Sequence, residues 1–136
     1  MADAVFVLDS FALMAHFEGE PAGAQVLELF EKAENGDITL AMSLMNVGEI
    51  VYLMSRERGR DSAKSMLADL KILPITFYEA TEGRIIAAAW LKAEYPISYA
   101  DAFAVGLAKE LKAKLASGDP EFGSVEKIVS VLWLDK

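Results

Sequence analysis

Segments of consecutive or alternating apolar residues recur along the chain, separated by longer segments with helical periodicity. Residues 4–8 form one continuous apolar run, which is typical of a parallel strand that is buried on both faces. The pattern predicts further strands over residues 37–42, 113–117 and 125–134, the last beside the strand that precedes it. Residues 73–77 are predicted to cross as an extended segment, because Pro74 is disfavoured in a central strand.

Helical periodicity predicts helices between these strands, over residues 11–17, 22–34, 44–58, 61–70, 79–94 and 98–112. Strands that alternate with helices indicate an α/β fold with a parallel sheet and right-handed crossovers. In the helix over residues 79–94, Ile85, Ile86 and Trp90 are predicted to face inward, with Trp90 as a core residue. A role for Trp90 in stacking on a nucleic-acid base would require its exposure.

One predicted helix is apolar on every side except for a single acid, Asp101. No other charged residue lies between Glu94 and Lys109, so this helix is expected to be buried, where an unpaired carboxylate is costly. Ser98 and Asp101 have the spacing of a capping box, in which the carboxylate accepts a hydrogen bond from the start of the helix. Taken alone, this spacing favours a capping role over a ligand role.

Three further acids occur in similar settings. Asp9 directly follows the first strand, where it could cap the next helix or bind a ligand at the strand end. Glu49 is the only charge between residues 44 and 54, which favours a metal ligand over a carboxylate neutralised by an internal partner. Asp119 follows the strand over residues 113–117, although Asp-Pro is also an ordinary turn.

These acids are expected to meet in one crevice. Because the carboxyl ends of parallel strands lie at one edge of a sheet, Asp9 and Asp119 would emerge together, and the helices of Glu49 and Asp101 can face them. Four carboxylates there would repel one another and retain protons unless cations were present. With oxygen ligands and no cysteine, the expected ions are Mg²⁺ or Mn²⁺. Such a site suits phosphodiester hydrolysis by a metal-activated water.

Composition narrows the class of protein. The 136 residues, 54% of them hydrophobic, are expected to form one domain (1–136) with many helices buried or used in a subunit interface. No apolar run approaches the ~20 residues of a membrane span, and the N-terminus lacks a signal-peptide pattern, so a cytoplasmic protein is expected. The absence of cysteine excludes disulfides, thiolate zinc sites and cysteine nucleophiles. The net charge of −8 argues against a broad basic surface and suits a partner with a basic segment.

Three arginines, Arg56, Arg58 and Arg60, surround a turn at Gly59. Such a run is more often a solvated turn than a patch that contacts RNA phosphates, and both interpretations stay open. The single histidine, His16, lies in a predicted helix among apolar residues, which favours a structural role over a catalytic one.

Four short segments of the chain carry the acids described above. They are Val7-Leu8-Asp9-Ser10, Asn46-Val47-Gly48-Glu49-Ile50, Ser98-Tyr99-Ala100-Asp101-Ala102 and Ala116-Ser117-Gly118-Asp119-Pro120-Glu121-Phe122. In this order and spacing they resemble the PIN-domain family, and most closely its VapC-type toxins of toxin–antitoxin pairs. The resemblance implies a three-layer α/β/α PIN-like fold and a ribonuclease that depends on Mg²⁺ or Mn²⁺. It also implies a homodimer whose activity is blocked by a cognate antitoxin, with the antitoxin tail over the acidic site.

The resemblance also assigns roles to individual residues. The implied acidic metal ligands are Asp9, Glu49, Asp101 and Asp119. Ser117 would hold a small hydroxyl position that orients the site, where threonine is commoner. The leading hypothesis is therefore an endoribonuclease toxin that acts on RNA, and the alternative is a catalytically silent PIN-like module that only binds a protein partner. A phosphatase that forms an aspartyl phosphate is disfavoured, because no second aspartate closely follows Asp9.

Overall fold

The computed structural model describes residues 4–135. They include one sheet of five parallel strands. The strand order is β3-β2-β1-β4-β5, and every neighbouring pair is parallel. The strands are β1 (Ala4–Leu8), β2 (Ile38–Ser43), β3 (Thr76–Tyr78), β4 (Lys114–Ser117) and β5 (Val131–Trp133). The predicted α/β fold with a short parallel central sheet is therefore confirmed.

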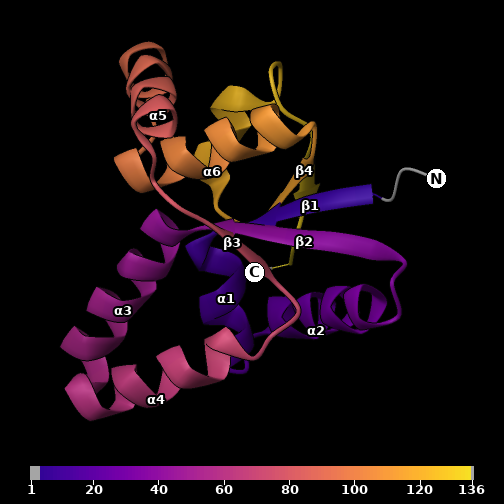
Figure 1. The fold of residues 1–136 in the computed structure, drawn as a ribbon, viewed down its shortest axis with the longest axis vertical. Coiled ribbons are helices and arrows are strands. Elements are labelled where there is room, and N and C mark those ends of the chain that lie inside the picture. The colour runs from indigo at the N-terminus through magenta and orange to yellow at the C-terminus, as the bar shows by residue number, and fades with distance from the viewer. Residues whose placement is uncertain (1–3, 136) are drawn as a thin grey trace.

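Helices cover both faces of this sheet, as Figure 1 shows. One layer contains α1 (Ser10–Phe17), α2 (Pro21–Glu34), α3 (Leu44–Arg58) and α4 (Arg60–Lys71). The other layer contains α5 (Glu82–Glu94), α6 (Tyr99–Leu111) and the 3₁₀ segment η1 (Pro120–Val125). The three-layer α/β/α arrangement predicted from the sequence is present.

The strands are apolar on both faces because each face packs against one helix layer. In β1, Leu8 belongs to the hydrophobic cluster of α1–α4 and Val7 to the cluster of α5 and α6, and both are fully buried. In β4, Ala116 and Leu115 divide in the same way. Successive side chains of a strand point to opposite faces, so a continuous apolar run is what a sheet covered on both sides requires. This packing holds the carboxyl ends of β1 and β4 in fixed positions.

The last part of the chain differs from the long strand predicted over residues 125–134. Strand β5 is only three residues long, and the fully buried Phe122 and Val125 belong to η1. Val125 lay inside the predicted strand, and its buried apolar side chain packs against the α5–α6 layer, so hydrophobicity alone did not distinguish it from a strand residue. The extended segment predicted over residues 73–77 ends in β3, which is an edge strand of the sheet. This position agrees with the prediction, because proline is disfavoured in a central strand.

Helix α5 buries a different face from the predicted one. Ala88 and Leu91 are buried, whereas Ile85, Ile86 and Trp90 are 39%, 48% and 69% exposed. The prediction that Trp90 is a core residue is therefore wrong. Helix α5 packs mainly against α6, so only a narrow stripe of it is covered. A helix that is apolar on several sides does not reveal from its sequence which stripe this is.

His16 packs among aromatic rings in the layer of α1–α4. Its ring lies edge-on to Phe17 and Phe30, with centroid distances of 5.1 and 4.9 Å. Partial burial lowers the pKa of His16 below 6.5, which favours the neutral imidazole. This environment matches the predicted structural role.

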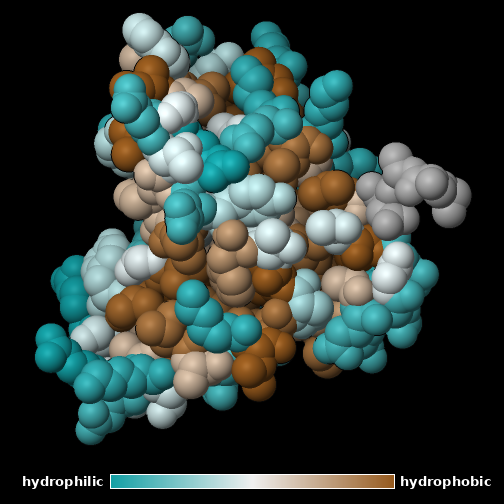
Figure 2. All heavy atoms as spheres, viewed as in Figure 1, coloured by the Kyte–Doolittle hydropathy of each residue, from teal (hydrophilic) through white to brown (hydrophobic). Residues whose placement is uncertain are grey.

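Apolar and hydrophilic residues are unevenly distributed over the face drawn in Figure 2. Apolar residues gather between α3, α4 and β3, whereas hydrophilic residues lie at the outer ends of α2 and of the α3–α4 hairpin. Within residues 4–135, no helix has the length and apolar content that a membrane crossing needs.

Candidate active site

The candidate site forms where strands β1 and β4 end side by side. The two strands pair in parallel, with Leu8 opposite Ala116. The residue after Leu8 is Asp9 and the residue after Ala116 is Ser117, so these two side chains lie next to each other at the edge of the sheet. Ser117 Oγ donates a hydrogen bond to Asp9 Oδ2 at 2.6 Å. The same hydroxyl oxygen accepts a hydrogen bond from the backbone N–H of Asp119 at 3.0 Å. One buried hydroxyl group therefore ties together the two strand ends that carry acids.

Asp9 has both of the roles that the sequence left as alternatives. It is the N-cap of α1, because its Oδ1 accepts a hydrogen bond from the Ala12 N–H at 3.0 Å. It is also an acid of the site and is only 1% exposed. Burial raises the pKa of Asp9 from 3.8 to about 7; hydrogen bonds from Ser117 and Ala12 oppose this rise, and the charge of Asp119 adds to it. A carboxylate has about four acceptor positions, so capping leaves room for a further ligand.

The carboxyl group of Asp101, near the start of α6, is not used in the cap of its own helix. Ser98 Oγ accepts a hydrogen bond from the Asp101 N–H at 3.1 Å, which is one half of the predicted capping box. The other half differs from the prediction, because the Ser98 backbone N–H donates to Glu121 rather than to Asp101. Helix α6 therefore has a complete cap that does not use the Asp101 carboxyl group.

Asp101 lies among other acids. Its pKa is raised from 3.8 to about 8, chiefly by burial and in addition by a hydrogen bond with Glu121 and by the negative charges of Asp9 and Asp119. Within residues 4–135, none of these acids forms an ion pair with lysine, arginine or histidine. The protein therefore gathers negative charge here without supplying the positive charge that would compensate it.

Glu121 is a member of this cluster that the sequence analysis did not assign. It is half-buried in the first turn of η1, and its backbone N–H donates to Asp119 Oδ1 at 2.9 Å. The available signal was its position two residues after Asp119, directly behind Pro120. Proline is common at the first position of a helical turn, so Pro120 predicts a turn that brings Glu121 back to Asp119.

Glu49 approaches the site less directly than the three aspartates. It is half-buried on α3 and accepts a hydrogen bond from the hydroxyl group of Ser10, which follows Asp9 in the chain. Its charge is not among the causes that raise the pKa of Asp9 or of Asp101. Glu49 therefore lies at the margin of the acidic cluster and is connected to it through Ser10.

Asn46 links the two helices that carry Glu49 and Asp101. It is fully buried on α3, and its Nδ2 donates to the backbone carbonyl of Ala100 on α6 at 3.2 Å. Its Oδ1 is also buried and has no hydrogen-bond partner within the described part of the chain. The link fixes the first turn of α6 against α3, although in the sequence Asn46 was only the polar neighbour of Glu49.

The donor set of the site fits a hard divalent cation. Every candidate ligand is a carboxylate, the ligand type that Mg²⁺ and Mn²⁺ prefer. Burial raises the pKa values of Asp9 and Asp101, and within the described residues neither acid forms an ion pair that would offset this rise. Among residues 4–135, no three His, Cys, Asp or Glu side chains converge closely enough to enclose a metal ion. Mg²⁺ is commonly held by one or two carboxylates together with substrate phosphates, so an open arrangement is compatible with it.

The predicted basic turn lies away from the acids, at the outer end of the α3–α4 hairpin. Arg56 and Arg58 are in the last turn of α3, and Arg60 begins α4. Two separate grooves divide them: Arg56 and Arg60 line one together with Lys64, whereas Arg58 lines the other together with Asp61. The three arginines therefore do not form one patch.

A family model described as the PIN domain matches residues 6–128, a range that includes all four predicted acids. The chain belongs to the PIN domain family. PIN nucleases of the VapC type are ribonucleases, and PIN nucleases generally use divalent metal ions. The oxygen-only donor set of this PIN domain agrees with that chemistry.

Solved structures that share the PIN fold include toxin–antitoxin proteins. VapBC2 from Rickettsia felis, bound to a fragment of promoter DNA, has a TM-score of 0.73 at 18% identity, over 96% of this chain and 99% of that chain. DNA-bound VapBC from Salmonella typhimurium has a TM-score of 0.72 at 12% identity, over 95% and 97%. VapC20 from Mycobacterium tuberculosis, a toxin that cleaves the sarcin-ricin loop, has a TM-score of 0.69 at 18% identity, over 90% and 95%. None of the curated proteins compared with this chain matches its sequence.

Proposed function

We propose that this PIN protein is a metal-dependent endoribonuclease and the toxin of a toxin–antitoxin pair. One observation carries the proposal: the Ser117 hydroxyl group links Asp9 to Asp119, the charges of both acids act on Asp101, and within residues 4–135 no cation of the protein pairs with any of the three. The metal dependence of PIN nucleases and the likeness to an RNA-cleaving toxin support this reaction class. RNA is the proposed substrate, and Mg²⁺ or Mn²⁺ the proposed cofactor.

The proposed roles follow from the contacts of each residue. The acids proposed to hold the metal are Asp9, Glu49, Asp101 and Asp119. When bound, a divalent ion would acidify the attacking water and stabilise the charge that develops on the phosphate. Ser117 orients Asp9 by donating to its Oδ2, and Glu121 completes the cap of α6, so the cap does not use the Asp101 carboxyl group. Both residues act by positioning the acids.

Cleavage of RNA by the purified full chain tests this function. We expect the protein to cleave a pool of structured RNAs when Mn²⁺ or Mg²⁺ is present, and not when EDTA removes the metal. Asp9→Asn and Asp101→Asn should each reduce the cleavage rate by about 100-fold or more, because each removes a charged oxygen that neither asparagine nor water replaces. Asp37→Asn, at an exposed loop acid, is the matched control and should cleave as the wild type does.

A catalytically silent PIN-like module predicts a different set of results. Such a module would cleave no RNA and would show no rise in Tm on addition of Mn²⁺. Cleavage at the wild-type rate by a folded Asp9→Asn/Asp101→Asn double variant would refute the nuclease proposal. Circular dichroism of that variant establishes that it is folded.

The proposed protein partner is a cognate antitoxin. VapBC2 and the Salmonella VapBC are toxin–antitoxin complexes of the same fold, which supports such a partner for this chain. A net charge of −8 and an uncompensated acidic site suit an antitoxin segment that carries basic residues. The homodimer also stays a prediction, and the exposed Ile86 and Trp90 of α5 offer an apolar surface for it.

A further inference from the structure

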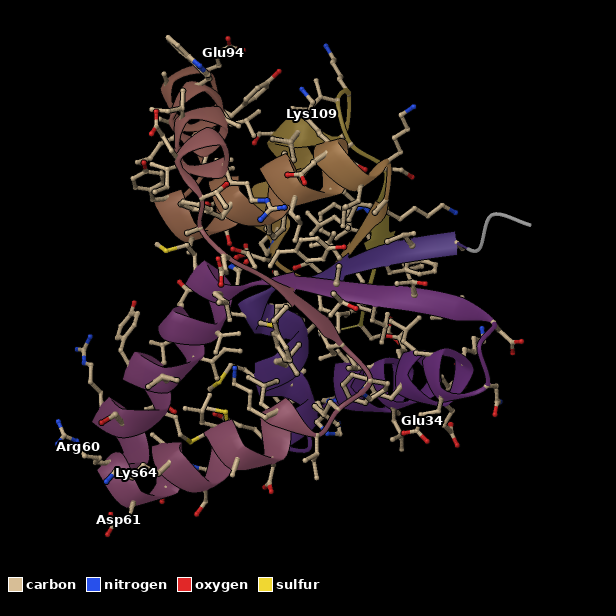
Figure 3. The ribbon with its side chains drawn as sticks, in the orientation of Figure 1. Glu34, Arg60, Asp61, Lys64, Glu94 and Lys109 are labelled. Carbon is tan, nitrogen blue, oxygen red and sulfur yellow. The ribbon has the colours of Figure 1, made fainter. Side chains whose placement is uncertain are left out.

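The groove between α3 and α4 gathers positive charge on a chain that is otherwise strongly acidic. Arg56, Arg60 and Lys64 line it, all three are exposed, and its volume is about 470 Å³. No acid lines this groove, and within residues 4–135 none of the three cations forms an ion pair. Figure 3 shows Arg60 and Lys64 close together at the outer end of the hairpin. We refer to this surface as the cationic groove.

The neighbouring acids in the sequence do not neutralise the cationic groove. Asp61 lines the groove on the other side of the hairpin, where it accompanies Arg58 and Asp69. Arg60 and Lys64 are four residues apart on one side of α4, and both line the cationic groove. The hairpin thus has one side with mixed charge and one side with positive charge only.

The cationic groove lies on the same side of α3 as Glu49, an acid of the proposed site. Glu49, Tyr52 and Arg56 recur at intervals of three and four residues, so they lie on one face of the helix. With a rise of about 1.5 Å per residue, Arg56 lies about 10 Å beyond Glu49 along the axis, and Tyr52 lies between them. Tyr52 is 50% exposed and itself lines the groove. An acid of the proposed site, an aromatic ring and Arg56 therefore follow one another along α3, and Arg60 and Lys64 line the same groove from α4.

This order matches the chemistry of a single nucleic-acid strand. Lysine and arginine bind its phosphates, and an exposed aromatic ring stacks on a base without selecting its sequence. We infer that the cationic groove binds the RNA strand next to the bond that is cleaved, with Arg56, Arg60 and Lys64 on its phosphates and Tyr52 against a base. The inference rests on the proposed ribonuclease function and adds to it the surface that guides the substrate. The cations alone would attract either RNA or an acidic protein segment. The exposed ring of Tyr52 between them and Glu49 favours RNA, because an RNA base can stack on it.

The test is binding of a fluorescein-labelled, mixed-sequence single-stranded RNA to the full chain in EDTA, where no cleavage occurs, measured by anisotropy across a series of salt concentrations. The groove variant is Arg56→Gln/Arg60→Gln/Lys64→Gln. The control variant Lys32→Gln/Arg58→Gln/Lys127→Gln removes the same charge from three exposed cations outside the groove. Circular dichroism and Tm establish that both are folded.

We expect the groove variant to bind RNA about tenfold or more weakly at low salt. Its slope of log K against log salt should be smaller by about 2, since each lost phosphate contact removes about 0.7. The control variant should keep the wild-type slope. Tyr52→Ala should weaken binding by about tenfold and Tyr52→Phe should restore it, because stacking needs the ring and not the hydroxyl group.

Equal losses in the groove and control variants would overturn the inference, since overall charge would then explain the binding. Failure of the wild type to bind RNA, or unchanged binding by the groove variant, would also overturn it. Unchanged RNA binding together with weaker binding of poly-L-glutamate would assign the groove to an acidic protein segment instead. The proposed function is tested separately in Mn²⁺: cleavage with an unchanged KM by the groove variant overturns this inference alone. Groove-dependent binding without any cleavage supports the groove and overturns the nuclease.

Discussion

The buried acid Asp9 should make the metal-free protein less stable than it would be with a neutral side chain. Its pKa is raised from 3.8 to about 7, so the folded state binds this proton more tightly than the unfolded chain does. The wild type therefore loses stability as the pH rises from about 4 to about 7, because Asp9 must ionise in a buried position. Since one pKa unit corresponds to 1.36 kcal/mol, the shift is worth up to about 4 kcal/mol at pH 8.

Asp9→Asn removes this ionisation and keeps the shape of the side chain. Asparagine is a good N-cap, so its Oδ1 can still accept the Ala12 N–H, and the hydroxyl group of Ser117 can turn to accept the new amide. At about 3 °C for each kcal/mol, Tm should rise by up to about 12 °C at pH 8 in EDTA. At pH 4.5 the gain should fall to about 1 kcal/mol, because wild-type Asp9 is protonated there when folded.

The assay is thermal unfolding followed by circular dichroism, with and without EDTA, at pH 4.5, 6 and 8. Asp37→Asn, at an exposed acid, is the control and should leave Tm unchanged at each pH. Addition of Mn²⁺ should reverse the order of the two proteins, because only the wild type then gains a full set of ionised ligands. A lower Tm for Asp9→Asn at pH 8 in EDTA, or a gain that does not change with pH, would refute the reasoning.

Three further predictions concern single side chains. Ser117→Ala removes a donor that lowers the pKa of Asp9, so the acidic limb of the cleavage pH profile should move up by about one unit. Gly118→Ala should lower the free energy of unfolding in urea by about 1–3 kcal/mol, because a Cβ there would lie 2.5 Å from the ring of Phe11. Trp90→Glu should shift the protein to monomer in sedimentation velocity if α5 forms the dimer interface, and an unchanged dimer would exclude that face.

The sequence predicted the sheet and the strand-end acids because both depend on local signals. A strand buried on both faces has to be apolar throughout, and the chain after it leaves the sheet at a known edge, which located Asp9 and Asp119. The partner of the Ser98 N–H was not predictable in this way. The capping-box spacing indicated Asp101, whereas the actual acceptor, Glu121, is 23 residues away in the chain.

The exposure of α5 and the division of the arginines also required the three-dimensional packing. The helix carries apolar residues on more than one side, and the position of α6 decides that Ala88 is covered and Trp90 is not. Arg56 and Arg58 are two residues apart, which places them on opposite sides of α3 and hence in different grooves. The sequence indicated a cluster of charge there but not its separation.

The cap of α6 determines which segments would be needed to graft this site onto another protein. The Asp101 side chain is left out of the cap of its own helix because a residue from a distant segment, Glu121, accepts the hydrogen bond from the Ser98 N–H. If the helix were grafted onto another scaffold without η1, its aspartate would be expected to fold back onto the vacant backbone N–H, as an isolated capping box does. Transplanting the proposed catalytic centre would therefore require both segments, because neither one encodes the geometry alone.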